Sequence, residues 1–281
     1  MGESQISLPC IFATLIYLEM IKKLGMLWLG ICVLHSCQIR EEISFKEDGS
    51  GMYQMAFDMS EMMKMGDVSD SLPPEPPVDT LINFASFLDE KRDSISRLPK
   101  EESSKLEALR PLQFAMKVNE EEKQMDINLQ YAFQDVSDIS KFADAINQAD
   151  IKELKEFTNP MAELNQETTA DTLKKKDGMN EMFSIAESFT TAFSKAGFKR
   201  TITEKAMADA IANKDTTLKA DDPFVDLIRF KQVYKFPYKI RKVSNKNAKI
   251  LSDFKGVEIE ANMYELSKDP KFFNIEVEFE Q

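Results

Sequence analysis

Alternating apolar and polar residues predict a β-hairpin around residue 50. Residues 42–46 and 52–59 alternate on either side of the polar turn 47–51. Gly49 and Gly51 favour the positive φ that tight hairpin turns require. The positions on one face are all apolar: Ile43, Phe45, Tyr53, Met55, Phe57 and Met59. We therefore expect this hairpin to place one face against a core, with a helical turn over residues 60–65.

A second hairpin, over residues 112–118 and 125–133, shows the clearest alternation in the chain. Its strands flank the polar turn 119–123 and carry apolar side chains on one face only. A sheet with one solvated face is typically antiparallel and needs a covering layer on the other face. We expect helices elsewhere in the chain to supply that layer.

Apolar residues recur at helical spacing in several segments. Asp79 is the expected N-cap of a helix that ends before Pro99 and carries Leu81, Ile82, Ala85, Leu88 and Ile95 on one side. Further helices are predicted over residues 101–109, over residues 139–157 in two segments, and over residues 204–213. The proline-rich stretch 72–77 excludes regular structure and predicts a stiff connector.

The C-terminal third is predicted to be rich in strands. A third hairpin is expected over residues 182–193 and 198–203, although Met182, Phe183, Ala186 and Phe189 also fit a helix. Further strands are expected over residues 225–243, 248–251, 257–263 and 272–279. The whole pattern predicts an α+β fold, mostly antiparallel sheet built from hairpins that alternate with helices packed on one face. The strands of the C-terminal third could add a second sheet to this fold.

These patterns divide the chain into segments of different character. Residues 1–36 are predicted to be a signal peptide and residues 37–160 a region of hairpins and helices. Residues 161–178 are polar and rich in Thr and Lys, which favours a loop. Residues 179–281 form the strand-rich region, which could be continuous with the first folded region.

The signal-peptide prediction rests on a short positive segment followed by an apolar run. Lys22 and Lys23 precede residues 24–34, an apolar stretch of the length of a signal-peptide core and too short to span a bilayer. Residues 1–19 fit such a signal poorly, because Pro9 and a second apolar patch stand ahead of the lysines. We therefore expect translation to start at Met20. The alternative is an uncleaved N-terminal anchor or a buried helix.

The sequence Leu34-His35-Ser36-Cys37 at the end of this run resembles the lipobox of bacterial lipoproteins. The resemblance implies cleavage before Cys37, acylation of that cysteine with palmitate-type chains, and attachment to a membrane. The chain as a whole resembles uncharacterised Bacteroidota-type envelope lipoproteins, which implies the bacterial outer membrane. In that group acidic residues after the cysteine favour display on the cell surface, so Glu41 and Glu42 favour the surface over the periplasmic side.

Composition limits the chemistry that remains after Cys37. No cysteine, histidine or tryptophan follows that residue. This excludes Cys-His and Ser-His nucleophile pairs, zinc sites built on thiolate or imidazole, and internal disulfides in the processed chain. The net charge of −12 argues against nucleic acid as a partner, because nucleic-acid binding needs a basic surface. No cofactor is expected.

Residues 229–249 form a basic stretch with no acidic residue in an otherwise acidic chain. Strand alternation would place five basic residues on one face: Arg229, Lys231, Lys235, Lys239 and Arg241. One hypothesis is a cationic surface that binds an envelope protein, a lipid headgroup or an anionic glycan. The alternative is a solvated face whose charges pair across strands with the equally regular Glu258, Glu260, Glu276, Glu278 and Glu280.

Methionines are concentrated between residues 52 and 65. They are Met52, Met55, Met59, Met62, Met63 and Met65. Thioethers are soft ligands, so a Cu(I) site is one hypothesis. The alternative is core packing, because Met55 and Met59 share a strand face with Tyr53 and Phe57.

The sequence therefore favours a lipid-anchored envelope protein, attached to the membrane through Cys37, that acts as a non-enzymatic binding or assembly module. The alternative is a glycan hydrolase that uses two carboxylates. Such an enzyme needs two facing acids across a sugar-binding cleft, a geometry that sequence spacing does not establish.

Overall fold

Two β-sheets organise the part of the chain that the computed structural model describes, namely residues 37–65, 76–141, 185–214, 217–222 and 225–280. The chain divides into two compact units, Met1–His35 and Ser36–Gln281, and all the described residues belong to the second. The predicted signal peptide, the polar loop 161–178 and most of the helix predicted over 139–157 lie outside the described residues.

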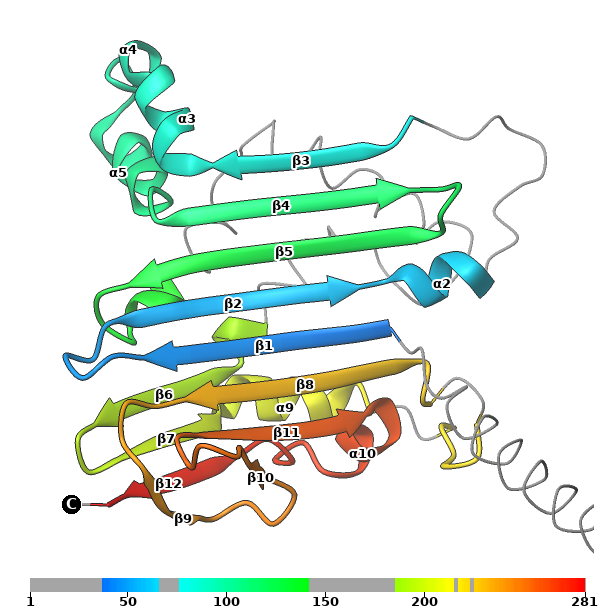
Figure 1. The fold of residues 1–281 in the computed structure, drawn as a ribbon. Coiled ribbons are helices and arrows are strands. Elements are labelled where there is room, and N and C mark those ends of the chain that lie inside the picture. Colours follow the sequence, from blue (N-terminus) through cyan, green and yellow to red (C-terminus); the bar gives the residue numbers. More distant parts are fainter. Residues whose placement is uncertain (1–36, 66–75, 142–184, 215–216, 223–224, 281) are drawn as a thin grey trace, which may run out of the picture. The chain divides into compact units, whose positions relative to one another are not determined.

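The larger sheet has eight strands in the order β10-β11-β8-β1-β2-β5-β4-β3 (Figure 1). Their bounds are β1 Cys37–Phe45, β2 Gly51–Asp58, β3 Val78–Asn83, β4 Leu112–Asn119, β5 Gln124–Phe133, β8 Ile228–Lys235, β10 Lys249–Ile250 and β11 Gly256–Asn262. Neighbouring strands are antiparallel except β1 and β8, which run parallel. The parallel pairing places β1, the first strand, beside β8 from the C-terminal third of the chain.

The smaller sheet has four strands in the order β6-β7-β12-β9. Their bounds are β6 Phe189–Ser194, β7 Gly197–Ile202, β9 Ile240–Val243 and β12 Ile275–Phe279. The α+β class is confirmed, and so is a second sheet in the C-terminal third. The hairpin predicted over 182–193 and 198–203 is confirmed from Phe189 onward, whereas residues 185–187 are helical.

The hairpin predicted around residue 50 is confirmed, with Phe45 opposite Gly51. Gly49 adopts a φ of 88°, which a glycine accommodates without a steric penalty. Gly51 serves a different purpose. A Cβ at this position would lie 2.0 Å from the backbone oxygen of Ser44 and 2.4 Å from the Phe133 ring, so β1, β2 and β5 can approach closely only because residue 51 is glycine.

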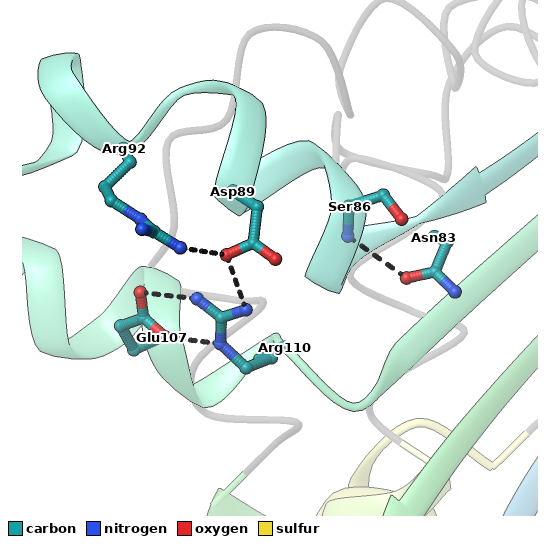
Figure 2. Close-up of polar contacts among 6 residues, drawn as sticks. All are labelled: Asn83, Ser86, Asp89, Arg92, Glu107 and Arg110. Carbon is teal, nitrogen blue, oxygen red and sulfur yellow. Dashed lines mark hydrogen bonds and ion pairs between the residues drawn. The ribbon is translucent and has the colours of Figure 1, made fainter.

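The prediction of a helix from Asp79 is wrong at its start. Val78–Asn83 forms the edge strand β3, paired with β4, and Asp79 lies opposite Lys117. Helix α3 begins only at Phe84 and runs to Glu90, because the Asn83 side chain accepts a hydrogen bond from Ser86 N at 3.3 Å and caps it (Figure 2). The apolar residues 81 and 82 fit both a helix and a strand, and pairing with β4 decides between them.

Ion pairs connect the three short helices between β3 and β4 (Figure 2). Asp89 of α3 accepts hydrogen bonds from Arg92 in α4 (Arg92–Ile95) and from Arg110, each at 3.1 Å. Arg110 follows α5 (Lys100–Ala108) and also binds Glu107 through Nε at 2.7 Å and Nη2 at 3.0 Å. The pKa of Asp89 is lowered by its hydrogen bonds to the two arginines.

The remaining helices are short and lie at strand ends. Helices α2 (Ser60–Met65) and α9 (Glu204–Ala212), together with α5, confirm three predicted helical segments. Helix α10 (Met263–Lys268) was not predicted as a helix. It starts at a capping box in which Asn262 Oδ1 accepts from Glu265 N and the Glu265 carboxylate accepts from Asn262 N.

Aromatic side chains fill the space between the two sheets. Phe45 of β1 stacks on Phe193 of β6 with ring centroids 4.2 Å apart. Phe198 of β7 packs on Tyr234 of β8 at 4.8 Å, and Phe279 of β12 packs on Phe236 at 4.9 Å. Aromatic contacts of this kind stabilise a core beyond the area they bury. The smaller sheet thus covers the apolar face of the larger sheet around β1 and β8.

Candidate functional site

Cys37 is the first residue of β1, a strand paired on both sides. It lies opposite Ile228 of β8, and the next residue, Gln38, lies opposite Asp58 of β2. In the full chain the Cys37 side chain is completely buried. A thioether to diacylglycerol at Sγ would therefore require this side chain to become exposed. No helix among the described residues is long and apolar enough to cross a membrane.

The two acidic residues that follow Cys37 are engaged within the folded unit. Glu42 accepts hydrogen bonds from Arg40 at 2.5 Å and forms an ion pair with Lys235 at 2.6 Å. Burial opposes ionisation of Glu42, but these two cations outweigh burial and leave its pKa below the ordinary value. Glu41 is only 2% exposed. In the folded chain neither carboxylate is a freely displayed surface signal.

Glu41 belongs to a buried polar cluster that also contains Arg200, Tyr53, Tyr234 and Gln232. Arg200 Nη2 of β7 donates to Glu41 Oε1 of β1 at 2.6 Å, and the arginine side chain is 1% exposed. The guanidinium lies 4.7 Å from the ring centroid of Phe189 and 5.6 Å from that of Tyr234. The cluster therefore links the smaller sheet to the larger one through charge and cation–π contacts.

Burial and charge raise the pKa of three groups in this cluster, Arg200, Tyr53 and Tyr234. Burial would lower the pKa of Arg200, but the negative charge of Glu41 outweighs burial and the pKa is raised. Burial raises the pKa of Tyr53 and of Tyr234. Because all three shifts are upward from ordinary values already above neutrality, these groups stay protonated at neutral pH.

Several atoms of the cluster have no hydrogen-bond partner among the described residues. They are Glu41 Oε2, Tyr53 OH, Arg200 Nε and Arg200 Nη1. Tyr234 is satisfied differently, because its hydroxyl donates to Gln232 Oε1 at 2.5 Å. Since the N–H groups of Nε and Nη1 lie on different edges of the planar guanidinium, the cluster is not arranged as a two-pronged anion clamp.

A pattern in the sequence indicates this cluster. It is hard to see, because each charged residue stands among the apolar residues of its strand. Ile39, Glu41 and Ile43 alternate on the inward face of β1, and Phe198, Arg200 and Ile202 alternate on one face of β7. Each strand thus places one charge at an inward position. Opposite charges at inward positions of two strands predict a buried pair, but only the fold shows that these two strands face each other.

The five basic residues proposed as one face are divided between two sheets. Arg229, Lys231 and Lys235 lie in β8 of the larger sheet, Arg241 lies in β9 of the smaller sheet, and Lys239 lies between them. The chain leaves the larger sheet after Lys235, so strand alternation does not continue through Pro237. No single strand face therefore carries all five residues.

Cross-strand ion pairs engage most of these basic residues. Arg229 contacts Glu260 at 3.3 Å, Lys231 contacts Glu258 at 3.1 Å, and Lys235 contacts Glu42 at 2.6 Å. Arg241 pairs with Glu278 of β12. This arrangement matches the alternative of a charge-paired sheet face. Binding of a partner by these residues stays a prediction.

The methionines between residues 52 and 65 do not share one surface. Met55 and Met63 are buried in the core, whereas Met52 lies on the other face of β2 and is exposed. The side chains of Met62 and Met65 lie outside the description. The placement of Met55 and Met63 is that of core residues, and the Cu(I) site stays a prediction.

Comparisons with known proteins give little guidance. No family model matches the chain, and no curated protein matches it. A solved structure, the folded domain of the Mycobacterium tuberculosis protein LppM determined by NMR, is similar over 88% of this chain and 92% of that one, with 8% sequence identity and a TM-score of 0.34. A similarity of this size carries no inference about fold or function.

Proposed function

We propose that this chain is a lipid-anchored protein of the bacterial cell envelope, attached through Cys37 and acting as a binding or assembly module. The observation that carries the proposal is the position of the folded unit. The compact unit begins at Ser36, beside the cleavage point that the sequence Leu34-His35-Ser36-Cys37 predicts. Cleavage there would release the folded unit complete, with Cys37 as its first residue.

Two further features support the proposal. Cys37 is the only cysteine at or after residue 37, so no disulfide within the processed chain competes for its thiol. The predicted attachment to the outer membrane, rather than to another membrane, follows from the resemblance to Bacteroidota-type lipoproteins and belongs to the proposal. No feature of the described residues favours the glycan hydrolase.

Mass spectrometry of the mature N-terminus tests the proposal. We expect a mature chain that begins at Cys37 and carries the mass of a diacylglyceryl group, together with an amide-linked acyl chain where the host adds one. Cys37→Ala should abolish acylation and release the protein from the membrane fraction. A chain that retains residues 1–36, or an unmodified Cys37 in a membrane-bound protein, would refute the proposal.

A further inference from the structure

Three exposed large apolar side chains lie on the elements at one edge of the larger sheet. Ile250 in β10 is 46% exposed, Phe254 in the turn between β10 and β11 is 59% exposed, and Met263 at the start of α10 is 41% exposed. Figure 1 shows β10, β11 and α10 together beyond β8, at the side of the sheet opposite β3. Exposed apolar side chains along one edge make that edge a candidate interaction surface.

The turn that carries Phe254 is strained and firmly held. Phe254 has a φ of 59°, a left-handed conformation that a bulky side chain rarely adopts. Its backbone N donates to Leu251 O at 2.9 Å, and its carbonyl accepts from Ile240 N at 2.8 Å. Lys255 N donates to Asp253 Oδ1 at 2.9 Å. An aromatic ring is thus held in solvent by a strained backbone conformation. Because such strain is concentrated at functional sites, this favours a functional role for the Phe254 ring.

Each of the three apolar residues has a lysine on its own element. Lys249 precedes Ile250, Lys255 follows Phe254, and Lys268 ends the helix that Met263 begins. These lysines are exposed and form no ion pair among the described residues; Lys268 lies over the Tyr264 ring at 5.1 Å. The acidic residues of β11 are neutralised, because Glu258 and Glu260 pair with Lys231 and Arg229, whereas Asp253 in the turn is exposed and, in the described part of the chain, accepts only from the backbone N of Lys255.

The combination of lysine with exposed apolar residues distinguishes between a protein partner and a membrane surface. Lysine is depleted at protein–protein interfaces. Lysines beside phenylalanine and aliphatic residues are typical of surfaces that lie on a membrane, where the ammonium groups meet lipid headgroups and the apolar groups enter the acyl boundary. The composition of this edge therefore favours a phospholipid bilayer.

The position of Cys37, the proposed lipid anchor, also favours a bilayer as the partner of this edge. Only β8 separates β1, which starts at Cys37, from β11. Two strand spacings place the two strands about 10 Å apart. Gln38 and Asn262 both lie opposite Arg229, so Cys37 is near the end of β11 that leads into Met263. Because β1 is paired with β8 from Cys37 onward, no spacer separates the anchor from the sheet.

We propose that the β10–β11 edge, formed by Ile250, Phe254, Met263, Lys249, Lys255 and Lys268, rests on the phospholipid bilayer that holds the acyl chains of Cys37. The proposal rests on the proposed lipid anchor and adds the orientation of the folded unit. The acyl chains of Cys37 would hold the protein at the membrane, and the surface patch would add a second contact that fixes the orientation of the folded unit. The polar outer face of the sheet and the β3 edge would then stay open to the envelope.

Tryptophan fluorescence tests this orientation directly. The only tryptophan of the chain is Trp28, within the segment that processing removes. We therefore suggest the variants Phe254→Trp and, as a matched control, Leu81→Trp, because Leu81 is 73% exposed on the opposite edge strand. Each processed lipoprotein would be placed in vesicles of phosphatidylcholine and phosphatidylglycerol, with and without brominated acyl chains. We expect a blue-shifted emission that brominated lipid quenches for Phe254→Trp, and an unshifted, unquenched emission for Leu81→Trp.

The outcomes separate the orientation from the anchor. Mass spectrometry of the same preparation reports acylation of Cys37. If Cys37 is acylated but both variants are quenched equally, or neither is, the orientation is refuted and the anchor stands. If Cys37 is not acylated, the same comparison is made by adding vesicles to full chains that also carry Trp28→Phe. Selective quenching of Phe254→Trp then supports the edge without the anchor, and its absence refutes the edge.

Discussion

Arg200 of the smaller sheet and Glu41 of the larger sheet meet in a hydrogen bond of 2.6 Å, at a point where their side chains are 1% and 2% exposed. Taking two charges out of water is costly, and their mutual attraction only offsets that cost while both are present. The pair therefore contributes less to net stability than its short distance suggests. Its larger effect is that removal of either partner alone strongly destabilises the folded unit.

Removing one partner of this pair should destabilise the folded unit strongly. We expect Arg200→Met or Glu41→Leu to lower the free energy of unfolding by about 3 to 5 kcal/mol, because each leaves one buried charge unpaired. The double variant should recover most of that loss, since two apolar side chains can pack in the space of the pair. Urea unfolding of the four chains in a double-mutant cycle measures this. Single variants that each cost less than about 1 kcal/mol would contradict a fully desolvated pair.

The hairpins could be predicted from the sequence because their information is local. Alternation in residues 112–118 and 125–133 defines β4 and β5, and the turn between them needs no distant contact. The parallel pairing of β1 with β8 could not be predicted in this way, because strand alternation states which face is apolar and not which strand lies alongside. The Arg200–Glu41 pair depends on the facing of two such strands, so it was missed for the same reason.

The boundary between β3 and α3 shows where two periodicities conflict. Residues 78–88 contain apolar residues compatible with a strand or a helix, and propensity alone does not decide between them. We expect Asn83→Ala to lower the free energy of unfolding by about 1 kcal/mol, because Asn83 Oδ1 caps α3. Asp79→Ala should change it by less than about 0.5 kcal/mol, because Asp79 is an exposed edge-strand residue. Chemical unfolding measures the free energy of unfolding of both variants. A larger loss for Asp79→Ala than for Asn83→Ala would mean that the helix begins at Asp79, as the sequence pattern predicts.

Glu42 should make stability depend on acidic pH. Burial disfavours its charge, but hydrogen bonds and charges from Lys235 and Arg40 outweigh burial and hold its pKa below the ordinary value of 4.5. A carboxylate whose pKa is lower in the folded state stabilises that state fully above its unfolded pKa, and this contribution is lost as pH falls below about 4.5 toward the folded value. The free energy of unfolding should therefore fall with acidification in this range.

The variant Glu42→Gln isolates this contribution, since it keeps the shape of the side chain and removes the titrating group. We expect its stability to fall less steeply than that of the native chain between neutral pH and pH values below 4.5. Glu258→Gln is a suitable control, because it also removes a paired carboxylate from the same sheet face. Parallel pH profiles for the native chain and Glu42→Gln, measured by thermal unfolding, would contradict the lowered pKa.

Gly49 and Gly51 offer a direct comparison of two reasons for glycine in one hairpin. At Gly49 the backbone has a φ of 88° and an added Cβ would meet nothing within 4 Å. Gly49→Ala should therefore cost only the strain of a left-handed residue, about 1 to 2 kcal/mol. At Gly51 the added Cβ would lie 2.0 Å from Ser44 O, a backbone atom of the paired strand, and 2.4 Å from the Phe133 ring. Relief would require β1 and β2 to separate, so Gly51→Ala should cost more than about 3 kcal/mol. Urea unfolding measures both variants, and an equal loss at the two positions would mean that the turn, and not the close approach of the strands, determines the need for glycine.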